Sequence, residues 1–130
     1  MKFKAQGHKN IQATHKTTLE FTKDTFVTKK GDCIIGIKAD YKLEELKELK
    51  CKKIKMTIEC NGKNDVVVGE LNKEFDDDRE MVIRMGTYKS PRTFLIRANK
   101  SAKYLNRELI EEIKKDKEIK IEVQCEKTTQ

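Results

Sequence analysis

The sequence predicts a mainly β protein of the α+β class, an antiparallel sheet or sandwich of about eight short strands with two packed α-helices. Apolar residues fall in short runs, several of which alternate with polar residues as half-buried strands do. Turn residues separate the runs, and no regular helices lie between them to connect parallel strands. At 130 residues the chain has the size of one domain, so residues 1–130 are expected to fold together.

The first third of the chain is expected to be mainly strands. Residues 2–8 form the first, and residues 13–21 form the second, with alternate side chains on one face. Residues 25–28 form a brief strand that ends at the turn 29–32. Residues 33–39 are almost continuously apolar, as in a strand covered on both faces. One face of the second strand carries Ala13, His15, Thr17, Leu19 and Phe21.

A helix and a hairpin are expected next. Asp40 can cap a helix over residues 43–49, whose leucines recur every three positions. Residues 54–60 alternate between apolar and polar, which indicates a strand with one buried face. Asn61-Gly62 then predicts a tight hairpin into a strand over residues 65–71. The remaining elements are an acidic loop 74–78, a hairpin of strands 81–85 and 92–98 joined through Gly86 and Pro91, a helix 100–115, a strand 118–125 and a frayed tail 126–130.

Positive charge is concentrated in two segments that contain no Asp or Glu. Residues 1–19 carry four lysines and both histidines, and residues 84–107 carry seven cations, including four of the five arginines. Because these segments hold +4 and +7 of a net charge of +7, the rest of the chain holds −4. Such a concentration predicts a surface that faces an anion.

The second segment contains the start of the expected helix 100–115. Asn99 is a suitable N-cap, and the free backbone N–H groups after it would favour an anion. Cations in the first turns would destabilise that helix unless an anion offset them. In the preceding hairpin Arg84 can face Arg92 or, in the other register, Thr93. The candidate ligand-binding residues are Arg84, Arg92, Arg97, Asn99, Lys100, Lys103 and Arg107.

These features predict a binding module for a phosphate-bearing anionic ligand, either a nucleotide or a nucleic-acid backbone. The structural alternative is that the cations pair with acids elsewhere on a solvated surface. A further alternative is a scaffold that docks on an acidic partner protein. Tyr88, Phe94 and Tyr104 are the few aromatics near the segment, so sequence-specific reading of RNA is not expected.

The two histidines predict a different function. His8 and His15 lie near facing ends of the first two strands and would meet if residues 9–14 closed a hairpin between them. Together they could act as acid and base on a phosphodiester, as the catalytic residues of a hydrolytic enzyme. They could also begin a divalent metal site, for which a third ligand is required. The candidates for that ligand are Glu20, Asp24, Asp32 and Asp40.

Composition also predicts the cellular location of the protein and the redox state of its cysteines. No run of 18 apolar residues and no secretory signal is present, so a soluble cytoplasmic protein without a membrane partner is expected. The high content of Lys and Glu is typical of heat-adapted proteins. The cysteines have no metal-binding spacing, and we interpret them as buried thiols, with a disulfide expected only in a hyperthermophile. They are Cys33, Cys51, Cys60 and Cys125.

Three blocks of sequence resemble a known family. They are Gly7-His8-Lys9-Asn10-Ile11 with its continuation to Thr22, Gly31 to Ile37 with Ala39-Asp40, and Arg92-Thr93 with Arg97 to Lys100. The combination covers nearly the whole chain and resembles a small archaeal family catalogued as domain of unknown function 371. The resemblance implies an archaeal, cytosolic, single-domain protein with a mainly β, sandwich-like fold. It implies no catalytic residues.

Overall fold

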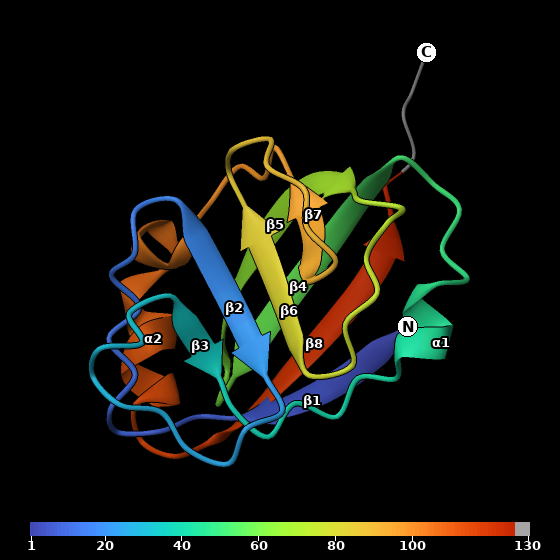
Figure 1. Ribbon diagram of the computed structural model, residues 1–130. Coiled ribbons are helices and arrows are strands. Elements are labelled where there is room, and N and C mark those ends of the chain that lie inside the picture. The colour runs from blue at the N-terminus through green and yellow to red at the C-terminus, as the bar shows by residue number, and fades with distance from the viewer. Residues whose placement is uncertain (127–130) are drawn as a thin grey trace.

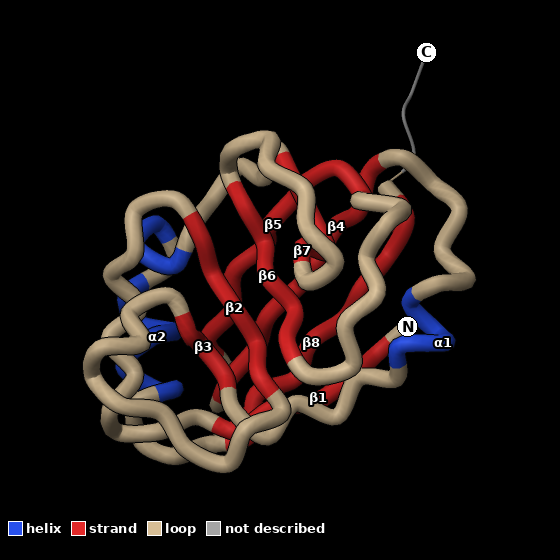
Figure 2. The backbone as a smooth tube through the Cα atoms, in the orientation of Figure 1, coloured by secondary structure: helices blue, strands red, loops and turns tan. Residues whose placement is uncertain are grey.

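The computed structural model describes residues 1–126, and within them eight strands form one sheet (Figures 1 and 2). The order across the sheet is β1-β8-β4-β5-β7-β6-β2-β3. Most neighbours are antiparallel, but β2–β3 and β6–β7 are parallel, so the sheet is mixed. The strands are β1 (Lys2–Gln6), β2 (Thr18–Thr22), β3 (Ile34–Gly36), β4 (Lys53–Cys60), β5 (Lys63–Leu71), β6 (Glu80–Arg84), β7 (Thr93–Ile96) and β8 (Glu118–Cys125).

The sheet curls until its two edges meet. Gln6 at the end of β1 forms an antiparallel bridge with Ile37, one residue beyond β3, through two backbone hydrogen bonds of 2.7 and 2.9 Å. Asp40 extends this contact, because its backbone N–H donates to the carbonyl of Lys4. In Figure 1, β3, β2 and β6 cross in front of β8, β4 and β5. The expected mainly β class is confirmed, although the two faces of the core belong to one continuous sheet.

The core lies between the front and back strands. A row of buried aromatic rings crosses it, with successive ring centroids 5.3 to 6.3 Å apart. Three of the four contacts are edge-to-face, and such contacts stabilise the core in addition to the burial of apolar area. The rings belong to Phe21, Phe3, Tyr41, Phe75 and Phe94.

Two α-helices and one 3-10 helix (η1, Ala102–Tyr104) accompany the sheet in the described residues. Helix α1 spans Leu43–Leu46, and α2 spans Arg107–Ile113. The buried face of α2 packs so closely on the chain after β1 that a side chain at Gly7 would collide with the carbonyl oxygen of Ile113. Within residues 1–126, no helix is long and apolar enough to span a membrane.

The elements with the clearest local patterns are confirmed. Strand β8 has the predicted bounds, and β4 pairs with β5 through the predicted hairpin. Asn61 and Gly62 have φ angles of 50° and 85°, as a two-residue turn of this kind requires. Most other elements are shorter than predicted, although β6 has the predicted length and begins one residue earlier. Residues 25–28 are a loop rather than a strand. The expected tail falls mostly on residues 127–130, which lie outside the described part.

The predicted hairpin of residues 81–85 and 92–98 is wrong. Strands β6 and β7 lie side by side but parallel, and β7 pairs antiparallel with β5 on its other side. The physical reason is the connecting segment, which does not turn back at once. It leaves β6 with the N–H of Met85 bonded to the carbonyl of Thr17 and later bonds the N–H of Asp76 to the carbonyl of Pro91. The chain thus returns to the starting end of β6 before β7 begins.

Both predicted helix caps are wrong for a shared reason, because each side chain bonds to a distant strand. Asp40 accepts the N–H of Lys4 on β1 at 2.7 Å, and α1 begins three residues later. Asn99 accepts the N–H of Val68 on β5 at 2.9 Å, which extends the β5–β7 contact. The true cap of α2 is Asn106, whose side chain accepts from Glu108 and Leu109.

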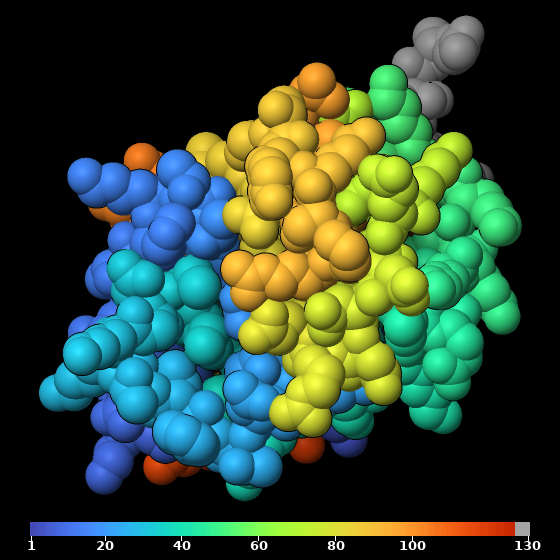
Figure 3. Space-filling view, viewed as in Figure 1, coloured from blue at the N-terminus to red at the C-terminus, as the bar shows by residue number. Residues whose placement is uncertain are grey.

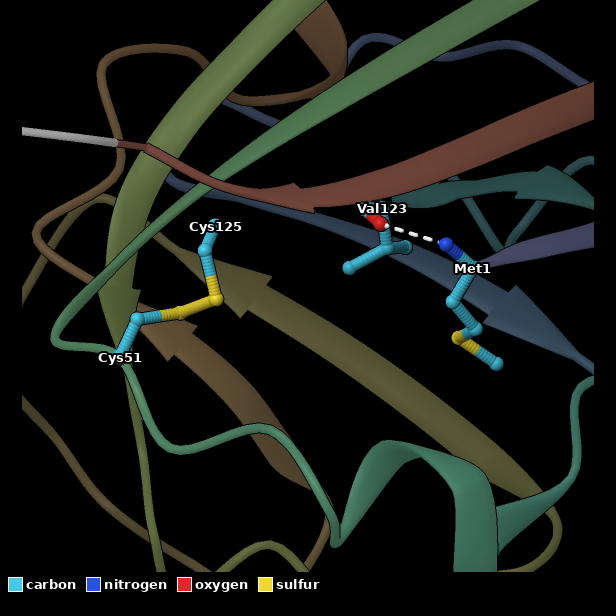
Figure 4. The surroundings of a disulfide bond; sticks show 4 residues. All are labelled: Met1, Cys51, Val123 and Cys125. Carbon is cyan, nitrogen blue, oxygen red and sulfur yellow. Dashed lines mark hydrogen bonds between the residues drawn. A yellow bond between two sulfur atoms is a disulfide. The ribbon is translucent and has the colours of Figure 1, made fainter.

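The sulfur chemistry also differs from the prediction. Cys51 and Cys125 form a disulfide that joins the segment before β4 to the end of β8, with Cα atoms 5.8 Å apart (Figure 4). Figure 4 also shows the N-terminal amine of Met1 donating to the carbonyl of Val123 on the same strand. Cys60 is a buried free thiol, as expected, and Cys33 is a half-buried one. The interpretation as thiols was therefore wrong for Cys51 and Cys125.

Candidate anion-binding surface

The last part of the first acid-free segment, residues 12–18, meets the second segment at one end of the molecule, whereas β1 of the first segment pairs with β8. Thr18 at the start of β2 lies opposite Arg84 at the end of β6. The carbonyl of His15 accepts the N–H of Lys103 at 3.1 Å, and the carbonyl of Lys16 accepts the hydroxyl of Ser101 at 2.8 Å. In Figure 1 the start of β2 and the end of β6 lie at the same end of the sheet. Positive charges that are far apart in the sequence thus share one region.

We call this region the basic surface and define it by three cations and two exposed tyrosines. Within residues 1–126, none of the three cations forms an ion pair with a carboxylate. Arg84 instead donates to the hydroxyl of Thr93 at 2.9 Å. In the space-filling view the loop 85–92, which follows Arg84, stands at the surface in the centre of the visible face (Figure 3). The basic surface consists of Lys16, Arg84, Lys103, Tyr88 and Tyr104.

Three other candidate cations are paired with acids outside their segment. Arg92 binds Glu80 and Arg97 binds Glu70, at 2.7 and 2.8 Å, and Lys100 binds Asp65. The hydrogen bond from Arg97 lowers the pKa of Glu70, and the bond to Glu80 raises the pKa of Arg92. The structural alternative, pairing with acids elsewhere, therefore describes these three residues. An anion at any of them would have to compete with a carboxylate that is already bound.

Arg107 is exposed, but its guanidinium is occupied by contacts with the backbone. Its guanidinium donates to the carbonyl oxygens of Ala13, Ala102 and Lys103, at 3.1, 3.2 and 2.9 Å. Ala13 is buried and has a φ of 52°, in the left-handed region that costs a residue with a side chain about 1 kcal/mol or more. Arg107 therefore fixes a strained turn of the first segment against the second.

The Arg107→Ala variant should lower the free energy of unfolding by about 2 kcal/mol, because hydrogen bonds to a charged group contribute more than neutral ones. Urea denaturation measures this loss. Arg79→Ala is the matched control, since Arg79 makes one exposed ion pair with Asp24 at 2.7 Å, worth about 0.5 kcal/mol. Equal losses in the two variants would contradict a special role for Arg107.

The expected contribution of a helix dipole to anion binding is not found in this structure. Helix α2 begins at Arg107 rather than at Lys100, and Glu108 lies in its first turn. Lys103 belongs to η1, so Lys100 and Lys103 are outside the α-helix. The acid near the N-terminus now complements the helix dipole, and no excess of cations remains there to be offset.

The two histidines do not face each other across a hairpin, because β1 pairs with β8 while β2 pairs with β3 and β6. His8 Nδ1 accepts the N–H of Asn10 at 3.0 Å. His15 Nδ1 accepts the N–H groups of Thr17 and Thr18 at 3.2 and 3.1 Å. In the part of the chain that the structure describes, no three His, Cys, Asp or Glu residues are grouped to hold a metal ion. A catalytic role for the pair stays a prediction.

Comparison with known proteins places the chain in a family. Residues 3–126 match the family model described as "Domain of unknown function (DUF371)". The chain belongs to this family. An uncharacterised protein of the archaeon Methanocaldococcus jannaschii is 48% identical over 124 residues, which cover 89% of this chain and 92% of that protein. The resemblance stated from the sequence blocks is thus confirmed.

Within residues 1–126 this DUF371 member has one buried acid, which the sequence alone did not identify as perturbed. Glu20 on β2 is 6% exposed, and the thiol of Cys33 donates to its carboxylate at 3.8 Å. Burial, with a smaller contribution from the charge of Glu80, raises the pKa of Glu20 to about 7, although Arg92 opposes this shift. Burial also raises the pKa of Cys33 to about 11, so the thiol is protonated and weakly nucleophilic at neutral pH.

No local signal could have revealed the burial of Glu20. It alternates with Leu19 and Phe21, which points it away from the core, and such positions are usually exposed. The structure covers this outer position from neighbouring elements, with Cys33 before β3 and the Glu80–Arg92 pair beside it. Those contacts come from residues 13 to 72 positions away in the sequence.

Proposed function

We propose that the protein is a binding module for a phosphate-bearing anionic ligand, a nucleotide or a nucleic-acid backbone, held on the basic surface. Lys16, Arg84 and Lys103 contact the phosphate groups. The observation that supports this most is the meeting of residues 12–18 of the first acid-free segment with the second, around three cations without a carboxylate partner in residues 1–126. Neighbouring cations repel one another, and a bound anion removes that repulsion.

Fewer of the candidate residues support this function than the sequence suggested, because several of them already have partners inside the protein. Arg92, Arg97 and Lys100 are already neutralised by Glu80, Glu70 and Asp65. Arg107 and Asn99 bond to the backbone. Of the seven residues that the sequence suggested, Arg84 and Lys103 are therefore the cations without a carboxylate partner in residues 1–126, although Arg84 Nε donates to the hydroxyl of Thr93. Lys16 joins them from the first segment.

The Lys16→Gln/Arg84→Gln/Lys103→Gln variant should bind a labelled oligonucleotide about 30-fold more weakly than the natural chain at low salt. If three phosphate contacts are lost, the slope of log affinity against log salt should also become shallower by about 2 for a single strand. Fluorescence anisotropy across a salt series measures both quantities, with ATP and polyphosphate as competing anions.

The matched control is Lys29→Gln/Lys50→Gln/Lys53→Gln, which removes the same net charge from exposed lysines elsewhere. It should lose only a few-fold in affinity through the weaker overall field. Equal losses in the two triple variants would overturn the basic surface as the site. If the natural chain binds no nucleotide, oligonucleotide or polyphosphate, the proposed function fails, and docking on an acidic protein becomes the better hypothesis.

A further inference from the structure

The basic surface contains two tyrosine rings that the fold leaves exposed. Tyr88 and Tyr104 are 66% and 53% exposed, whereas Tyr41 is buried and donates its hydroxyl to the carbonyl of Asp77. Within residues 1–126 neither exposed tyrosine uses its hydroxyl in a hydrogen bond. These rings therefore contribute little to the core.

Each exposed ring lies against a cation of the same surface. The guanidinium carbon of Arg84 is 5.0 Å from the ring centroid of Tyr88, and the ammonium of Lys103 is 5.8 Å from that of Tyr104. Cations at such distances are attracted to an aromatic face. The arrangement repeats on two segments, the end of β6 with the loop after it and η1, so each segment presents one ring with one positive charge.

The backbone near both rings is held in place. Met85 and Lys103 donate their N–H groups to the carbonyls of Thr17 and His15, which tethers the two segments to the strand entry at residues 15–17. The carbonyl of Gly86 accepts the N–H of Arg97. A ring on a tethered backbone loses less conformational freedom when a ligand stacks on it.

We infer that the ligand of this surface is single-stranded nucleic acid, whose bases stack on Tyr88 and Tyr104 while its phosphates contact Arg84, Lys103 and Lys16. The inference rests on the proposed function and names its ligand class. A duplex keeps its bases stacked inside and presents mainly phosphates, whereas a single strand presents free base faces. Stacking on an aromatic ring accepts any base, so this mode of binding needs only a few aromatic side chains and does not select a base sequence.

The test compares three probes on the natural chain and on Tyr88→Ala/Tyr104→Ala. The probes are an oligonucleotide of about 12 nucleotides, its duplex and polyphosphate. The variant should bind the single strand about 30-fold more weakly, since each stacked base contributes roughly 1–3 kcal/mol. Affinities for the duplex and polyphosphate should change less than about twofold, and the salt dependence should be unchanged because no phosphate contact is removed.

Two controls separate stacking from general effects. Tyr88→Phe/Tyr104→Phe keeps both rings and should bind the single strand like the natural chain. Phe26→Ala removes a ring that is 65% exposed on the loop after the other end of β2, and it should also leave binding unchanged. Thermal unfolding of each variant checks that the fold is intact.

The outcomes distinguish this inference from the function on which it rests. Unchanged single-strand affinity in Tyr88→Ala/Tyr104→Ala overturns the stacking, and so does a natural chain that prefers the duplex or polyphosphate. Either result leaves anion binding by the three cations standing. A natural chain that binds none of the probes overturns both.

Discussion

Removal of the Cys51–Cys125 disulfide is expected to lower the free energy of unfolding by about 4 kcal/mol, the largest effect that the structure predicts for any single bond. The two residues are 74 positions apart, so the bond closes a long loop in the unfolded chain. Closing such a loop restricts the unfolded state much more than the folded state. In the folded state β4 and β8 already hold the ends together, with Ile54 opposite Cys125.

Urea denaturation of the natural chain with and without reductant measures this effect, together with a Cys51→Ser/Cys125→Ser variant. The variant should have the stability of the reduced natural chain and should not respond to reductant. Thiol titration of the unfolded protein should find the free thiols of Cys33 and Cys60 before reduction and all four cysteines after it. A natural chain whose stability is indifferent to reductant would contradict the prediction.

The parts of the fold that could be predicted are those determined by neighbours in the sequence. The alternation of residues 54–60 and the turn at Asn61-Gly62 predicted the β4–β5 hairpin, because the partner strand follows at once. Strand β8 likewise has its predicted bounds. In each case period and turn chemistry suffice to specify the element.

The errors concern residues whose partners are distant in the sequence. Asn99 has the right side chain for a helix cap, but it pairs with Val68, and nothing near it in the sequence indicates that contact. The same limit applies to β6 and β7, whose spacing suggested a hairpin although each found a different antiparallel partner. Local patterns specify what a segment can form, and long-range pairing decides which of those forms is adopted.

The candidate site, like the fold, could be predicted only in part from the sequence. Counting charges located two segments, and the end of the first does meet the second, as the Thr18–Arg84 pair shows. It could not show which cations are free, since the carboxylates that neutralise Arg97 and Lys100 lie on β5, some 27 to 35 residues earlier. Nor could it find the buried Glu20, whose environment is assembled from several elements.

Glu20 should make the protein less stable as the pH rises from about 4.5 to about 7. Its pKa is about 7 in the folded protein and 4.5 for an ordinary glutamate, so between these values the folded state holds a proton that the unfolded state has lost. Stability therefore falls with rising pH through this window and levels off above it. The shift corresponds to about 3 kcal/mol as an order of magnitude, because one pKa unit is worth about 1.4 kcal/mol.

The other shifted carboxyls act in a different pH range. The pKa values of Asp65, Glu70 and Glu112 are lowered, so their contributions to stability are complete above their ordinary pKa values and are lost only on further acidification. They therefore do not obscure the decline expected between pH 5 and pH 7, which is attributed to Glu20.

The Glu20→Gln variant should remove this decline, because an amide of nearly the same shape carries no charge at either pH. At pH 8 the variant should be more stable than the natural chain by up to about 3 kcal/mol, and near pH 5 the two should differ little, since burying an ionised carboxylate is what costs stability. Urea denaturation at both pH values measures this, with Glu44→Gln on the exposed face of α1 as the control that should keep the natural pH dependence. If the decline persists in Glu20→Gln, the buried carboxyl is not its source, and the covering of β2 by Cys33 and Arg92 would have to admit more water than the structure indicates.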